Sequence, residues 1–208
     1  KTYAGKRKEN LRRVLSNLSG LYGYGRVVFG ASVVVRRAIN TAWDAPSNVD
    51  FCHFGAMRGL DFAKHHAAAV SVGRMEVPIH TIDGVVAALT FDDDTPEDPF
   101  DKRGDGCGSD GGPLRIPVEN QVLRMRSGHD ALVPVPMYPG TWARIVQRQY
   151  REEELKQFVG RLRPVYRQGE APVWFAISKV VPDNVIVDDL VNLDDLVYRN
   201  TRFIKVFE

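Results

Sequence analysis

The sequence has 208 residues, of which 44% are apolar and 26% are charged, and its 28 Lys and Arg against 26 Asp and Glu give a formal charge of +2. This composition is close to that of an average soluble globular protein. It excludes a disordered chain, which would be poor in apolar residues and strongly charged. It also excludes a fibre, because the 18 Gly and 12 Pro occur without a period.

A chain of this length predicts one large domain with enough buried surface to fold without cross-links. The two cysteines, Cys52 and Cys107, are too few for a disulfide framework. We therefore expect free thiols, in a reducing intracellular compartment or a virion rather than a secreted protein. No apolar run approaches the ~20 residues that a membrane span needs. Because the sequence begins at Lys1, we expect a processed chain or a fragment of a longer one.

The near-neutral total hides strong segregation of charge along the sequence. Residues 1–40 carry nine basic side chains and one acidic one, a charge of +8, whereas residues 91–113 carry two basic and eight acidic ones, a charge of −6. Residues 114–180 are again basic, with a charge of +5. Since charges act over a Debye length of about 10 Å, these local fields indicate more about binding than the total does.

The first predicted element is a basic amphipathic helix over about residues 6–18. Its leucines and Val14 recur at helical spacing, and Gly20 is a stop signal followed by a Gly/Tyr hinge. We interpret residues 1–25 as a basic helical arm and hinge, outside a single domain that residues 26–208 form.

The next apolar run predicts a strand that ends near Phe29, because its residues are β-branched or aromatic, and then a helix over residues 31–43. Alanine-rich sequence favours a second helix over about residues 56–70. Strands are predicted over residues 70–77 and 79–91, the latter being apolar enough for a core strand.

Residues 92–113 are predicted to form a long mobile loop, with eight acidic side chains among glycines and prolines. The acids do not have the spacing of an EF-hand or of a zinc site, so we assign no metal. We interpret the segment as an acidic docking loop. Its candidate residues are Asp92, Asp93, Asp94, Asp101, Asp105 and Asp110.

The strongest predicted element is a helix over residues 141–162, where apolar residues recur at helical spacing. Strands and helices alternate without a βαβ rhythm, which favours the α+β class. We expect a mostly antiparallel sheet packed on this long helix. The other predicted elements are strands over 114–125, 173–181 and 202–207, an extended segment over 131–137 and a short helix over 190–198; the expected core strands are 85–89, 114–125, 173–181 and 202–207.

Two basic clusters are candidates for binding nucleic acid or a protein partner. In the first, Lys and Arg on the N-terminal helix would neutralise phosphates and the hinge tyrosines would stack on bases; it comprises Lys6, Arg7, Lys8, Arg12, Arg13, Tyr22 and Tyr24. In the second, residues at i, i+4 and i+7 share one helical face; it comprises Arg144, Arg148 and Arg151, continued by Arg161, Arg163 and Arg167. A solvated helical face is the alternative for both.

Cysteine and histidine occur together in the sequence without a recognised motif. Cys52, His65, His80 and Asp105 are the set that an enzyme would use, but no zinc spacing, phosphate loop or nucleophile elbow is present. We therefore assign no catalytic residue and no cofactor, and favour a protein that is not an enzyme.

Three functions remain open. The one we favour is a non-enzymatic structural subunit of a larger assembly, a virion component or an organellar complex, which docks on copies of itself or other subunits through the basic arm and the acidic loop. The first alternative is an RNA- or DNA-binding protein that uses the Arg and Lys clusters. The second is a hydrolase-type enzyme that uses the Cys and His residues. We expect no membrane span.

Overall fold

The computed structural model describes residues 3–56 and 61–198, and both helices and strands occur in it. The α+β class is therefore confirmed. Contacts divide the chain into two compact units, so the expected single domain is not confirmed. Unit 1 comprises residues 1–74, 155–178 and 187–208, and unit 2 comprises residues 75–154 and 179–186.

The two units differ in formal charge. The sequence of unit 1 contains 19 basic and 10 acidic residues, a charge of +9. That of unit 2 contains 9 basic and 16 acidic residues, a charge of −7. The segregation of charge along the sequence therefore corresponds to two compact units of opposite sign.

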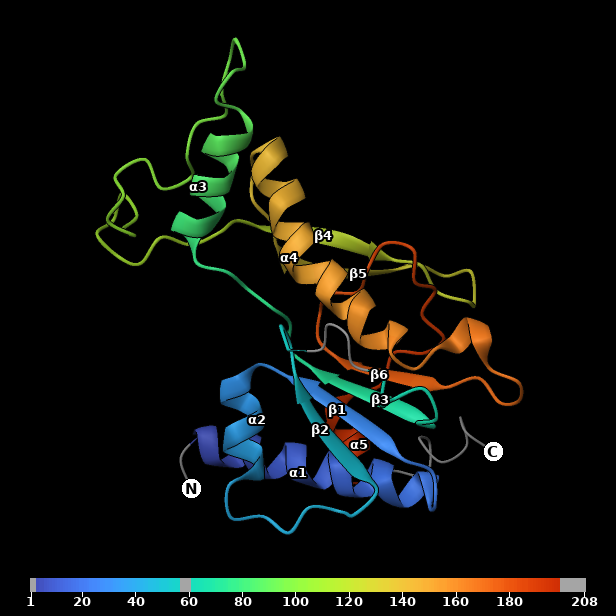
Figure 1. Ribbon diagram of the computed structural model, residues 1–208. Helices are drawn as coiled ribbons and strands as arrows, with labels where there is room; N and C mark the ends of the chain where they lie inside the picture. Colours follow the sequence, from blue (N-terminus) through green and yellow to red (C-terminus); the bar gives the residue numbers. More distant parts are fainter. Residues whose placement is uncertain (1–2, 57–60, 199–208) are drawn as a thin grey trace. The chain divides into compact units, whose positions relative to one another are not determined.

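Unit 1 is built on a four-stranded sheet in the order β2-β1-β3-β6, in which every neighbouring pair is parallel (Figure 1). The expected mostly antiparallel sheet is wrong, because α2 returns the chain from the end of β1 to the start of β2, as parallel pairing requires. The elements are β1 (Val27–Ala31), α2 (Val33–Asn40), β2 (Val49–His53), β3 (Ala68–Val72) and β6 (Val173–Ile177).

Helix α1 (Tyr3–Tyr22) belongs to the core of unit 1 instead of standing outside it as an arm. Val14, Leu15 and Leu18 are at most 1% exposed and pack in one apolar cluster with residues of β1, β3 and β6. The helix also continues beyond Gly20, the predicted stop. The short helix α5 (Leu193–Tyr198) was predicted and lies against α1, as Figure 1 shows.

The two faces of β1 pack against different elements, as the alternation of a strand requires. Phe29 belongs to the apolar cluster of α1, whereas Gly30 faces the ring of Phe158. A Cβ atom at position 30 would lie 2.5 Å from that ring, so only glycine allows this approach. A short 3₁₀ helix (Pro164–Tyr166) then leads towards β6.

Unit 2 contains α3 (Ile79–Leu89) and the antiparallel pair β4 (Val118–Leu123) and β5 (Ala131–Pro136). The strand predicted over residues 79–91 is wrong, because Ile82 and Val86 share a helical face in an apolar cluster with Tyr138. All residues between α3 and β4 are described, and none belongs to a helix or strand. The boundary between the units falls within α4 (Thr141–Gly160), the long helix that was predicted.

Two predicted elements fall partly or wholly on residues that the structure does not describe. The helix expected over residues 56–70 is wrong in its described part, since residues 61–67 form turns and β3 begins at Ala68. The strand expected over residues 202–207 lies outside the described residues. Among the helices of the described part, none has the length and apolarity that crossing a membrane requires.

Candidate functional site

The basic side chains of α1 are only partly available for binding. Arg12 donates hydrogen bonds to the carbonyl oxygens of Ile39 (2.8 Å) and Thr41 (2.6 Å) and stacks over the ring of Trp43. Arg13 pairs with Glu9 at 3.7 Å. These two residues stabilise α1, whereas Lys6 and Arg7 are exposed and Lys8 is half-buried.

The arginines predicted to form a ridge on α4 hold unit 2 together. Arg144 pairs with Glu119 at 2.6 Å, and Arg148 pairs with Glu152 and Asp183. Arg151 is fully buried, where it donates to the carbonyl oxygen of Pro136, to the sulfur of Met137 and to Glu152. Each of the three arginines donates to protein groups, so this cluster is a poor candidate for phosphate binding.

The two hinge tyrosines differ completely in exposure. Tyr22 packs edge-on against Phe175, and burial raises the pKa of its hydroxyl to about 12. Tyr24, two residues on, has its whole side chain in solvent. Of this pair, only Tyr24 presents a ring on which a base can stack.

Several carboxylates of the predicted docking loop fold the loop itself. Asp101 accepts from the amides of Gly104 and Gly106 at 2.9 and 2.8 Å. Asp105 and Asp110 accept from the amides of Cys107 and Gly112 in the same way. Asp92, Asp93 and Asp94 are exposed and remain the part of the loop that is open to a partner.

The Cys and His set of the enzyme hypothesis is divided between the two units. Cys52 is buried and donates to the carbonyl oxygen of Phe29, and His65 is an exposed residue of unit 1. His80 and Asp105 belong to unit 2. Within the residues that the structure describes, no three His, Cys, Asp or Glu side chains gather as ligands for a metal ion.

A different group of polar side chains gathers at the amino edge of the unit 1 sheet. Residues that precede parallel strands meet at one edge, and here they come from the segments before β1, β3 and β6. The amide of Ala67 donates to the carbonyl oxygen of Arg26 at 2.8 Å, which joins two of these segments. We define the amino-edge surface by its exposed or half-exposed members: Tyr24, Arg26, Lys64, His65, Arg163, Tyr166 and Arg167.

Asp50, the second residue of β2, is the polar centre beneath this surface. Arg26 donates two hydrogen bonds to its carboxylate at 2.7 and 2.5 Å, and His66 Nε2 lies 2.6 Å from the same group. The hydrogen bond from Arg26 lowers the pKa of Asp50 below its usual range. Burial lowers the pKa of His66, whose ring is therefore neutral at neutral pH.

The segment before β6 contributes two arginines to the surface. Arg167 donates only to backbone, to the carbonyl oxygens of Lys64 and His66, so no carboxylate neutralises its charge among the described residues. Arg163 holds Asp61 at 3.0 Å, and this hydrogen bond lowers the pKa of the carboxyl. The backbone of Arg163 is left-handed, with φ of 51°, directly before Pro164, which is a strained place for a residue with a side chain.

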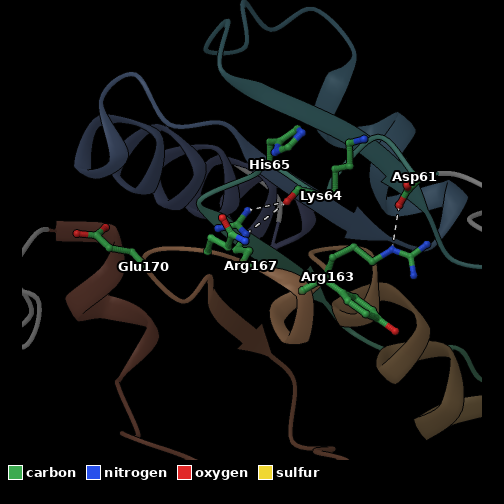
Figure 2. Close-up of a pocket in the computed structure, with 8 residues that line it drawn as sticks. Asp61, Lys64, His65, Arg163, Arg167 and Glu170 are labelled. Carbon is green, nitrogen blue, oxygen red and sulfur yellow. Dashed lines mark hydrogen bonds and ion pairs between the residues drawn. The ribbon is translucent and has the colours of Figure 1, made fainter.

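These residues surround a cavity with a volume of about 840 Å³. Figure 2 shows Lys64 and His65 on one wall and Arg163 and Arg167 on the segment that faces them. The described residues supply no ion pair or hydrogen-bond partner for the Lys64 ammonium group. The lining is Asp61, Lys64, His65, Arg163, Tyr166, Arg167, Gln168 and Glu170.

The arrangement is suited to binding anions that carry flat rings. Three cations face one hollow, Tyr24 and Tyr166 are strongly exposed, and the volume is in the range of ~300–1,000 Å³ that small-molecule sites occupy. The sequence indicated Arg163 and Arg167 as part of a basic cluster. It gave no signal for Arg26 or Lys64, because only parallel pairing of β1 and β3 brings them beside that cluster.

Comparison of the chain with protein-family models, with curated proteins and with solved structures finds no match.

Proposed function

We propose that the protein binds single-stranded nucleic acid through the amino-edge surface of unit 1. The observation that carries this proposal is the cavity in which Lys64, Arg163 and Arg167 converge beside the exposed ring of Tyr166. Proteins that bind single strands combine a positively charged groove for the phosphates with aromatic rings for the bases. The formal charge of +9 on unit 1 supports the same partner.

The proposal assigns nucleic-acid binding to the amino-edge surface instead of the basic residues of α1 and α4 that the sequence indicated. Arg12, Arg151 and Arg167 all donate to protein groups, whereas the ammonium group of Lys64 makes no hydrogen bond or ion pair among the described residues, although its charge helps to lower the pKa of Asp61. A basic side chain that makes no ion pair within the protein can neutralise a phosphate without first giving up another partner.

Fluorescence anisotropy with a labelled single-stranded oligonucleotide tests the proposal. We expect binding that weakens steeply as salt is added, because each phosphate contact releases condensed counterions. Lys64→Glu should weaken binding by about tenfold or more and lower the slope of log affinity against log salt by about one. Lys6→Glu on α1 should leave affinity unchanged if the amino-edge surface binds the oligonucleotide, and should lower it if the predicted arm does.

The matched control is Lys102→Glu, which makes the same charge change at a side chain of unit 2 that is 72% exposed. Lys102 pairs with Asp98 at 2.9 Å and does not line the cavity, so the change should leave affinity at physiological salt unchanged within about twofold. Equal losses in Lys64→Glu and Lys102→Glu would show that only net charge matters. Loss in Lys6→Glu alone would return the site to α1.

A second candidate is the structural subunit of a larger assembly, which one feature of unit 2 favours. Val118, Val122 and Leu132 lie on one face of the β4–β5 pair and are 53–65% exposed. Exposed apolar side chains in a contiguous group are characteristic of surfaces that bind other proteins. Light scattering coupled to size exclusion tests this candidate, and a monomeric mass that Val122→Lys does not alter counts against assembly through this face.

A further inference from the structure

His66 lies within the segment that carries the exposed Lys64 and His65, yet its own ring is withdrawn from solvent. The side chain is 3% exposed, and its Nε2 atom lies 2.6 Å from Asp50 Oδ2. Its Nδ1 atom is buried with no hydrogen-bond partner among the described residues. One short segment therefore carries both Lys64 and His65, which line the cavity, and a buried ring that anchors them.

The hydrogen bonds determine which form of the ring fits. Asp50 is held ionised by Arg26, so its carboxylate accepts and Nε2 of His66 donates. Protonation would add an N–H at Nδ1, which is buried and has no acceptor among the described residues, while the ring itself makes a T-shaped contact with Phe62. An unsatisfied buried donor is costly, so the geometry favours the neutral ring.

Three charged groups act on this ring. Asp50 favours its protonation, whereas Arg26 and Arg167 oppose it. Burial is the largest influence and lowers the pKa of His66 below the ordinary value of 6.5. The neutral ring therefore stabilises the fold fully above about pH 6.5, and this contribution is lost as the pH falls through the window between that value and the lowered pKa.

The backbone of the same segment is fixed from the opposite wall of the cavity. Arg167 donates to the carbonyl oxygen of His66 and, at 3.1 Å, to that of Lys64. Besides the backbone bonds of Ala67 and the Asp61–Arg163 pair, two side-chain contacts therefore hold the segment next to Lys64 and His65: the guanidinium group of Arg167 and the bond between His66 and Asp50. Release of the ring removes the second of these contacts and leaves Lys64 and His65 less well positioned.

We propose that neutral His66 is a positioning residue that holds Lys64 and His65 in the cavity wall, so that protonation of its ring weakens nucleic-acid binding in acid. The binding readout rests on the function proposed above. The direction in which affinity changes on acidification distinguishes this inference from a simple effect of net charge. Acidification makes a protein more positive, which by itself strengthens phosphate binding, whereas the release of this segment lowers affinity.

The test compares affinity for the labelled oligonucleotide at about pH 7.5 and about pH 5.5, a range in which histidine charges change. Wild-type affinity should fall between these two pH values, because protonation of the His66 ring weakens its hold on the segment that carries Lys64 and His65. His66→Gln keeps an N–H donor for Asp50 and does not titrate, so its affinity should not fall. His65→Gln is the matched control at the adjacent exposed residue and should show the wild-type fall.

Two results would overturn the inference: wild-type affinity that rises on acidification, or an equal fall in wild type and His66→Gln. An NMR titration of the wild-type protein needs neither a variant nor a ligand. The amide resonances of residues 61–67 should shift together with the titration of the His66 ring, and their constancy would also refute the inference. Absence of oligonucleotide binding at pH 7.5 refutes the proposed function instead, and the NMR titration still decides the role of His66.

Discussion

The two units carry opposite formal charges, +9 and −7, and they use their arginines in different ways. In unit 2, Arg144, Arg148 and Arg151 are bound by carboxylates and carbonyl oxygens. In unit 1, Arg26 and Arg163 are likewise bound by carboxylates, but Arg167 meets only carbonyl oxygens and makes no ion pair among the described residues. Basic residues in a sequence therefore become candidates for ligand binding only once those that are bound by other groups of the protein have been excluded.

Replacement of Arg151 by Ala should have the largest effect of the changes considered. Arg151 is fully buried. Its loss leaves Glu152, which is 4% exposed, with Arg148 as its remaining ion-pair partner among the described residues. Loss of one partner of a buried ion pair costs about 3–5 kcal/mol of unfolding free energy. Urea denaturation measures this loss.

The Arg151→Ala variant also tests whether the arginines of unit 2 take part in nucleic-acid binding. Oligonucleotide affinity of the folded fraction should not change in Arg151→Ala, whereas Lys64→Glu should lose affinity and keep its stability. A variant at Arg151 that is stable but cannot bind nucleic acid would assign binding to α4, and the two units would then not differ in the way described.

Replacement of Glu97 should have the next largest effect on the unfolding free energy, because this acidic residue of unit 2 caps a helix. Its carboxylate accepts from the amides of Trp142 and Ala143 at 2.8 and 2.9 Å, at the first turn of α4. Glu97→Ala leaves these amides without that acceptor and should lower the unfolding free energy by about 1 kcal/mol, as loss of a helix cap does. Thermal unfolding monitored by circular dichroism measures the change, and Asp94→Ala, at an exposed position, is the control that should show none.

Secondary structure was predictable wherever one periodicity dominated. Helices α1 and α4 follow from their apolar spacing, and β6 follows from its β-branched and aromatic run. The region of α3 failed because a run of Val and Ala is compatible with a buried strand or a helix, and only the helical face formed by Ile82 and Val86 decides between them.

The sheet and the site were less predictable for a common reason. β2 contains Asp50 and His53 and does not have the apolar character of a core strand, so the parallel pairing of β1 with β2 was missed. Without that pairing, nothing in the sequence places Asp50 beside His66, 16 residues on. The amino-edge surface is a product of topology, which local patterns do not contain.

A smaller effect is expected from Arg26→Gln, which removes the strongest partner of Asp50. The lowered pKa of Asp50 means that its ionised form contributes stability above its ordinary value of 3.8, and this contribution is lost as the pH falls through the lowered pKa. The stability difference between wild type and Arg26→Gln should therefore be present at neutral pH and vanish in acid. Because Arg26 is half exposed, the difference should be smaller than that of Glu97→Ala.

Urea unfolding at a series of pH values measures this dependence. His66→Gln in the same series separates the two ionisations, because the stabilisation by neutral His66 is lost below about pH 6.5 and that by ionised Asp50 only below about pH 3.8. A difference that persists unchanged in strong acid would show that Arg26 stabilises the fold by packing and not through the ionised carboxylate.

The smallest effect is expected at the exposed end of the acidic loop. Replacement of Asp92, Asp93 and Asp94 by Asn removes three of the negative charges of unit 2 without touching a hydrogen bond that folds it, so stability should stay within about 0.5 kcal/mol of wild type. Affinity for the oligonucleotide should rise slightly at low salt, because less negative charge repels the phosphates, and this rise should shrink at physiological salt, where screening is stronger. A large rise that survives physiological salt would mean that these carboxylates occupy the amino-edge surface in competition with nucleic acid, and the opposite charges of the two units would then be complementary binding surfaces, as the assembly hypothesis requires.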